Sequence, residues 1–119
     1  MPTVTVVTNV DLAKADAVKL VGAVTDCLYP IVGCPAGYVH VHVLAGQPVS
    51  FGGGDCVTPC CQTRIVMAGD CSRELRSEMA AKLQPVLDAA LQGLNSAKTQ
   101  ILFEKTSPEY IAIGAVLLQ

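Results

Sequence analysis

Apolar and polar residues in the first half of the chain follow the order of a strand, a helix and a second strand. Residues 3–8 alternate threonine with valine, the two-residue period of a β-strand. Apolar residues then recur at helical spacing from 17 to 31, with Asp11 placed to cap the helix and Gly33 placed to end it. Residues 38–44 place valine at alternate positions, which predicts a second strand.

The second half of the chain repeats this order. Residues 62–68 predict a strand, and residues 100–103 predict another. Between them, an apolar stripe over residues 75–94 predicts a helix that Asp70 or Ser72 caps. The chain therefore reads as two strand-helix-strand units.

Three smaller features complete the pattern. Residues 49–51 predict a short edge strand, which the following glycines end. Pro85 lies inside the second helix and predicts a kink, because its ring displaces a backbone hydrogen bond. The tail, residues 110–118, is almost wholly apolar, and we expect it to be extended.

The duplicated units predict a single α/β (α+β) domain over residues 1–119. Right-handed crossovers make the two strands of each unit parallel and place both helices on one face of a four-stranded mixed sheet. No segment of the chain remains to cover the other face. We therefore expect a second copy to cover it, which predicts an oligomer.

Composition narrows the possible functions. The chain is 51% hydrophobic and only 15% charged, so part of its apolar surface is expected at a subunit interface. A formal charge of −2 with scattered lysines and arginines excludes the basic field of a nucleic-acid-binding protein. No apolar run is long enough to span a membrane, and the N-terminus lacks the pattern of a signal peptide. We therefore expect a cytoplasmic protein.

Six cysteines and two histidines raise the question of a metal or redox site. The spacing of Cys56, Cys60 and Cys61 matches no standard zinc motif, and the absence of a secretory signal argues against a disulfide framework. We expect free thiols and no metal site. His40 and His42 alternate with valine, which is typical of one strand face, so we expect structural or channel-lining roles for them.

Pro2 opens the first strand and is the candidate catalytic residue. If Met1 is removed, Pro2 becomes a secondary amine at the N-terminus. Burial beside apolar side chains lowers the pKa of such an amine, because the charged form loses its solvation. A neutral amine can act as a general base when a substrate proton is within reach.

Together, these features make the chain resemble the macrophage migration inhibitory factor and D-dopachrome tautomerase family of the tautomerase superfamily. The resemblance rests on Pro2 opening a strand, on Thr8-Asn9 after that strand, on the valine-histidine strand 38–43 and on Phe51-Gly52-Gly53. It implies a homotrimer whose three sheets form a barrel around a channel. It also implies an MIF-like keto–enol tautomerase, an isomerase of phenylpyruvate-like aromatic 2-oxo acids or dopachrome-like compounds, with the N-terminal proline as base and no cofactor.

The rest of the family's site carries over only in part. A substrate-binding lysine in a Gly-Lys-Pro motif is replaced here by Cys34, and the backbone donor on the fourth strand corresponds to Val66. Tyr38 matches an aromatic residue at the pocket edge. Arg64 shares a strand face with Val66, so it either supplies the missing positive charge or is a solvated or interface arginine. A polar tyrosine and asparagine pair is replaced by Gln100 and Leu102, and the tail is more apolar.

Two alternatives to a tautomerase remain open. One is a cytokine-like binding protein with weak or no catalysis, secreted without a signal peptide and recognised by a protein receptor. The other is a decarboxylase or dehalogenase of small acids, which would need paired arginines. Arg73 and Arg76 form such a pair in the sequence, but the start of the second helix is a poor place to meet Pro2.

Overall fold

Two strand-helix-strand units form the body of the computed structural model, which describes residues 1–118. The first unit consists of β1 (Pro2–Thr8), α1 (Lys14–Val32) and β2 (His40–Leu44). The second consists of β3 (Cys61–Ala68), α2 (Arg73–Ala90) and β4 (Thr99–Thr106). Single-turn 3₁₀ helices and a terminal hairpin complete the chain: η1 (Ala36–Tyr38), η2 (Ser96–Lys98), η3 (Pro108–Tyr110), β5 (Ala112–Ile113) and β6 (Val116–Leu117).

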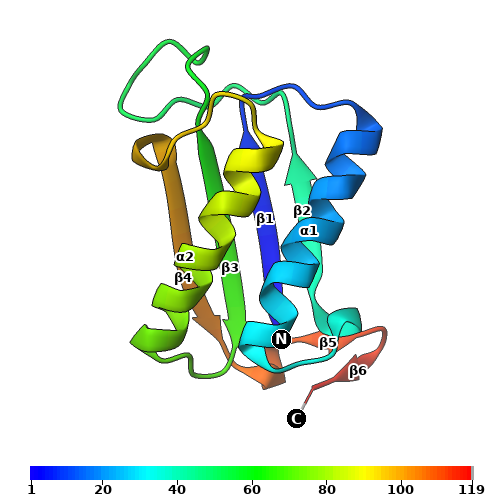
Figure 1. Ribbon diagram of the computed structural model, residues 1–119. Coiled ribbons are helices and arrows are strands. Elements are labelled where there is room, and N and C mark those ends of the chain that lie inside the picture. Colours follow the sequence, from blue (N-terminus) through cyan, green and yellow to red (C-terminus); the bar gives the residue numbers. More distant parts are fainter. Residues whose placement is uncertain (119) are drawn as a thin grey trace.

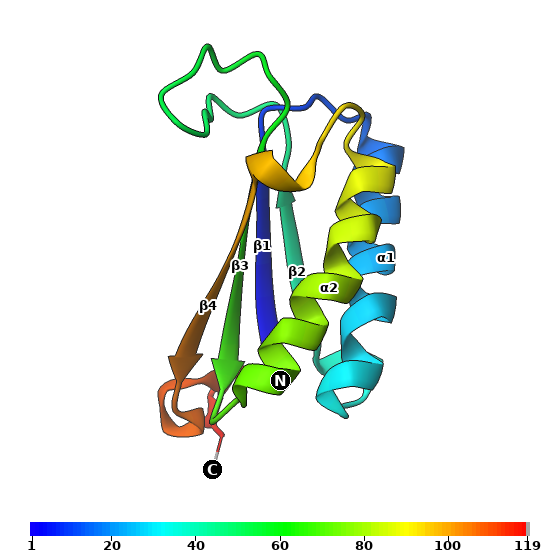
Figure 2. The ribbon, with the colours of Figure 1, turned by 60° about the vertical axis from the view of Figure 1, so that its left-hand side comes forward.

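The four long strands make one mixed sheet in the order β2-β1-β3-β4. Within each unit the strands are parallel, and β1 and β3 are antiparallel where the units meet. Both helices lie against the same face of the sheet (Figures 1 and 2). The fold class predicted from the duplicated pattern is therefore confirmed.

The core lies between the sheet and the helices, because the alternation along the strands and the helical stripes direct apolar side chains there. Val4 and Val6 of β1 and Ile65 of β3 are fully buried on this face. The helices contribute fully buried leucines and methionine: Leu20, Leu28, Met79, Leu83 and Leu87.

The second helix begins as predicted, whereas the first does not. The Ser72 Oγ accepts a hydrogen bond from the Leu75 N–H at 3.1 Å and caps α2. Asp11 does not cap α1, which starts after Ala13 without a side-chain cap. Asp11 instead lies against Gly46, where a β-carbon would collide with its carboxylate. Gly33 ends α1 in the left-handed conformation (φ 79°), as its position predicted.

Three strand boundaries differ from the sequence-based expectation. Residues 49–51 form no strand and belong to a long loop, because none of the described strands pairs with them. The second strand begins at His40, since the residues before it form η1. The last strand of the second unit runs from Thr99 to Thr106, longer than predicted.

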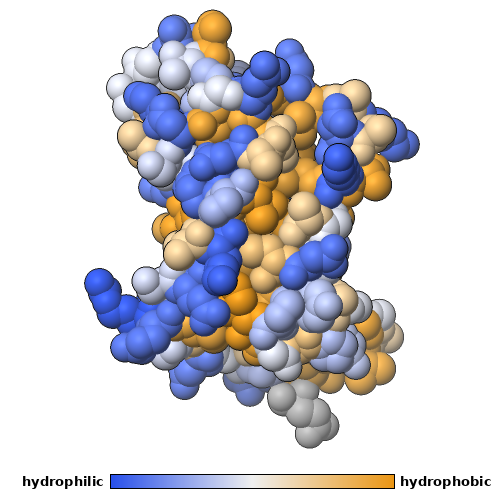
Figure 3. Space-filling view, viewed as in Figure 1, coloured by the Kyte–Doolittle hydropathy of each residue, from blue (hydrophilic) through white to orange (hydrophobic). Residues whose placement is uncertain are grey.

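The tail is a hairpin rather than one extended segment. It turns at Gly114, which has a φ of 62° that favours glycine, and β5 pairs with β6 in antiparallel register. Its apolar side chains stay exposed in the single chain, with Val116 at 71%. Viewed from the helix side, apolar surface shows between α1 and α2 and again near this hairpin (Figure 3).

The sheet face opposite the helices is uncovered and mostly polar. Its alternate positions carry the polar residues Thr3, Thr5, His40, His42, Gln62, Arg64, Gln100 and Glu104, together with the apolar residues Val7, Leu44, Val66 and Leu102. Within residues 1–118, no helix has the length and apolar character needed to cross a membrane.

Candidate functional site

Pro2 occupies the first position of β1, a central strand of the sheet, and is buried. Its register partner on β3 is Met67. The next pair outward is joined by a hydrogen bond, in which the Ala68 N–H donates to the Met1 carbonyl oxygen at 3.4 Å. Hydrogen-bonded and non-bonded pairs alternate in an antiparallel ladder, so Pro2 and Met67 form a non-bonded pair. A residue without an N–H is tolerated at such a position.

Register places the other predicted site residues at the same end of the sheet. Thr3 pairs with His40 on one side, so Tyr38 in η1 lies just beyond that end of β2. Thr3 pairs with Val66 on the other side. The turn that holds Cys34, after α1, and the β5–β6 hairpin lie at this end too (Figure 1). The fold thus brings Pro2, Tyr38, Cys34 and Val66 to one end of the molecule.

Arg64 lies on the uncovered face, as its alternation with Val66 predicted, but its guanidinium group is already paired with a carboxylate. One guanidinium nitrogen, Nη2, is 2.7 Å from both carboxylate oxygens of Glu104. Hydrogen bonding to this carboxylate raises the pKa of the Arg64 guanidinium further above its already high value. In register Arg64 pairs with Thr5, three positions along β1 from Pro2. The partner Glu104 was not foreseen, because it lies on β4, far away in sequence.

A hollow of about 480 Å³ lies at the Pro2 end, between the start of α2 and the ends of β3 and β4. Its walls include Met67, the register partner of Pro2, together with Arg76. Lys105, also in the wall, forms an ion pair with Asp70. The antiparallel pairing of β1 and β3 places the start of α2 at the same end of the sheet as Pro2, although Pro2 itself does not line this hollow.

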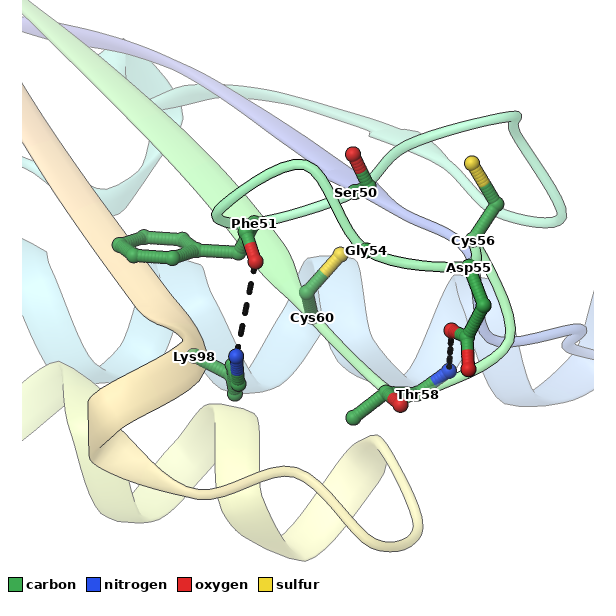
Figure 4. A pocket seen from close by; sticks show the side chains of 8 residues that line it. All are labelled: Ser50, Phe51, Gly54, Asp55, Cys56, Thr58, Cys60 and Lys98. Carbon is green, nitrogen blue, oxygen red and sulfur yellow. Dashed lines mark hydrogen bonds between the residues drawn. The ribbon is translucent and has the colours of Figure 1, made fainter.

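A second group of pockets lies at the opposite end of β1. Figure 4 shows the smaller one, about 80 Å³, which residues of the 50–60 loop and Lys98 line. The Lys98 Nζ donates to the Phe51 carbonyl oxygen at 3.5 Å. A larger hollow of about 340 Å³ shares Phe51 and Cys60 with it. Neither pocket includes a residue of the Pro2 end.

Cys56, Cys60 and Cys61 lie near this second end, and all six cysteines are free thiols. Burial raises the pKa of the Cys60 and Cys61 thiols, which lowers their thiolate fraction and their reactivity. Among residues 1–118, no three histidine, cysteine or acidic side chains cluster closely enough to hold a metal ion.

Solved structures similar to this chain share its fold at low identity. The macrophage migration inhibitory factor of Toxoplasma gondii is 22% identical with a TM-score of 0.84, over 94% of this chain and 96% of that one. The homologue from Prochlorococcus marinus is 20% identical with a TM-score of 0.88, over 98% and 99%. The macrophage migration inhibitory factor-like protein of Entamoeba histolytica is only 12% identical, yet its TM-score is 0.86 over 98% of each chain.

No curated protein sequence matches the chain. The family model of macrophage migration inhibitory factor (MIF), in contrast, matches residues 1–117, nearly the whole chain. That match covers both strand-helix-strand units and the tail hairpin. The chain belongs to the macrophage migration inhibitory factor family.

Proposed function

We propose that this protein is a keto–enol tautomerase in which Pro2, exposed as an N-terminal amine by removal of Met1, is the general base. Membership of the MIF family supports a tautomerase or a cytokine-like protein in general. The observation that carries the enzymatic proposal is the position of Pro2, buried at the head of a central strand. An amine at that position is next to apolar side chains of the core rather than free in solvent.

The chemistry follows from that environment. Burial disfavours the ammonium form, so the amine is neutral at cellular pH and ready to accept a proton. It removes a proton from the carbon next to a carbonyl group and returns it to the oxygen. A positioned acid–base group contributes about 10²–10⁴-fold to the rate. The reaction needs neither a metal nor an organic cofactor.

The substrates we propose are enolisable aromatic 2-oxo acids of the phenylpyruvate type, or dopachrome-like compounds. Tyr38 would border the site and Val66 would line it, with Cys34 in the position where the family's lysine binds the acid group. Cys34 carries no positive charge, and Arg64 is paired with Glu104. Acidic substrates should therefore bind weakly, and substrates with a less charged tail should be favoured.

Arg64 can bind a substrate carboxylate only by exchanging its partner, which gives a test. We expect Glu104→Gln to lower KM for phenylpyruvate about threefold, the modest size of an exposed ion pair. The measurement is steady-state turnover at low ionic strength. Arg64→Ala in the Glu104→Gln background is the matched control and should abolish the gain. An unchanged KM in Glu104→Gln would show that Arg64 takes no part in acid binding.

We further propose a homotrimer, with the apolar hairpin and the uncovered sheet face turned toward neighbouring copies. Sedimentation should give a single species of three times the 12.4 kDa chain mass. Val116→Lys should shift this species toward monomer, because a charge replaces an exposed apolar contact on the hairpin. Val57→Lys, on the loop at the other end and equally exposed, is the control. A stable monomer of the unmodified protein would contradict the proposal.

The replacement of the family's substrate-binding lysine by Cys34 favours one alternative, a cytokine-like protein that binds a receptor and has weak or no catalysis. In that case the protein acts outside the cell after export without a signal peptide, whereas the enzyme is proposed to act in the cytoplasm. Turnover separates the two functions. If protein that begins at Pro2 converts phenylpyruvate no faster than buffer, the enzymatic proposal fails and the binding function takes its place.

A further inference from the structure

The hollow of about 480 Å³ between the start of α2 and the ends of β3 and β4 is on the helix side of the sheet (Figure 2). Met67, Phe103 and Lys105 line it from the strands, at positions that alternate with residues of the uncovered face. The uncovered face, which is proposed to meet neighbouring copies, is therefore on the other side of the sheet. Pro2 does not line the hollow.

The hollow carries one positive charge that is not balanced. Of the two cations in its walls, Lys105 forms an ion pair with Asp70, which lines the hollow as well. Glu104, the other acidic wall residue, is paired with Arg64 of the uncovered face. Within the described part of the chain, no carboxylate is within ion-pair distance of Arg76. Arg76 therefore supplies the unbalanced charge.

The guanidinium group of Arg76 is tethered through a single nitrogen. Its Nε donates to the main-chain oxygen of Ser72 at 3.4 Å, across one turn at the start of α2. That bond uses one of the five N–H donors of the group, so the donors on the two Nη atoms are left for another acceptor. Carboxylates suit such a group well, because they accept two parallel hydrogen bonds from it.

Two apolar residues line the same hollow. Met67 is only 5% exposed, and Phe103 is partly buried where it packs against the core cluster. An apolar group laid against them leaves water, which favours binding by about 25 cal/mol for each Å² that is covered. The volume of about 480 Å³ is also within the range of small-molecule sites, about 300–1,000 Å³.

We infer that this hollow is a second ligand site, which binds a small monocarboxylic acid with an apolar or aromatic tail. Arg76 holds the carboxylate, and the tail packs against Met67 and Phe103. The single negative charge of such an acid matches the one unbalanced positive charge. Inorganic phosphate fits less well, because it has no apolar part to cover the two side chains. The inference goes beyond the proposed tautomerase, since Pro2 takes no part and no covalent bond changes.

Phenylacetate is the probe for this site, because it has the carboxylate and the ring but no keto group to tautomerise. Binding is followed by NMR in protein labelled with ¹³C at the methionine methyl groups. The Met67 signal should shift until the site is saturated, while that of Met79, fully buried in the core, serves as the internal reference. Acetate, which lacks the tail, should bind about tenfold more weakly. Equal affinity for the two acids would overturn the inference.

Arg76→Gln should raise Kd for phenylacetate about tenfold, the effect of losing hydrogen bonds to a charged group. Arg73→Gln is the matched control, because it removes the same charge from the same turn of α2. Arg73 is exposed and does not line the hollow, so its Kd should stay within twofold of the unmodified protein. Circular dichroism establishes that both variants are folded. Equal Kd values in the two variants, whether raised together or unchanged, would overturn the inference.

A further variant separates this site from the Pro2 site. Lysine inserted between Met1 and Pro2 prevents removal of Met1, so Pro2 has no free amine. Phenylacetate should bind this variant with a Kd within twofold of that for the processed protein. Loss of binding would show that the probe occupies the Pro2 site, which overturns the inference and leaves the tautomerase proposal standing. Binding that persists in protein without turnover would support the second site although the proposed function had failed.

Discussion

Pro2→Gly should lower kcat for phenylpyruvate tautomerisation by about 10²–10⁴-fold, the range that a positioned acid–base group contributes. Glycine is small enough for Met1 still to be removed, so the chain keeps a free amine at the same position. That amine is primary, lacks the ring that fixes it in the strand, and is held less firmly toward the substrate. The measurement is turnover by variant protein whose N-terminal mass has been verified.

A fall in activity counts only if the fold survives. Pro48→Gly, in the loop at the opposite end of β1, is the matched control and should leave kcat within about twofold. The urea midpoint of each variant shows whether stability has changed. If Pro2→Gly, folded and processed, turns over phenylpyruvate as fast as the unmodified protein, Pro2 is not the base.

The second large effect is on stability. Leu83 is fully buried between α2 and the sheet, within the core cluster that both helices share. Leu83→Ala should lower the free energy of unfolding by about 2–5 kcal/mol, because it removes buried methyl groups and leaves a cavity. Urea unfolding followed by circular dichroism measures the loss, at one protein concentration because assembly contributes to stability.

Val18→Ala is the matched control for Leu83→Ala. Val18 lies on α1 but is 61% exposed, so its truncation should change the free energy of unfolding by no more than about 0.5 kcal/mol. Similar losses in the two variants would mean that the α2 stripe does not form the core described above.

The body of the fold could be predicted because its residues repeat with the period of their elements. The valines at alternate positions of β1 and the leucines along α2 indicate which faces are buried, whatever their distant partners. The segment 49–51 misled for the opposite reason. Its residues suit a strand, but a strand needs a neighbour to pair with, and none of the described strands of the chain lies in that position.

The candidate site was predictable only where one residue type carries the chemistry. Pro2 could be named from its place at the start of a strand. Arg76 could not be placed there, because the start of α2 reaches the Pro2 end only through the antiparallel pairing of β1 with β3. Arg64 forms an ion pair with Glu104 on a different strand, so the local sequence pattern could not predict this pairing.

The measurement that tests the central claim most directly is keto–enol conversion of phenylpyruvate by untagged protein made from its own start codon. Mass spectrometry first establishes that the chain begins at Pro2, and sedimentation establishes its assembly. We expect a rate clearly above that of buffer, which would mean that the buried amine is neutral and basic. If the processed and assembled protein is no faster than buffer, Pro2 is not a catalytic base and the enzymatic function is contradicted.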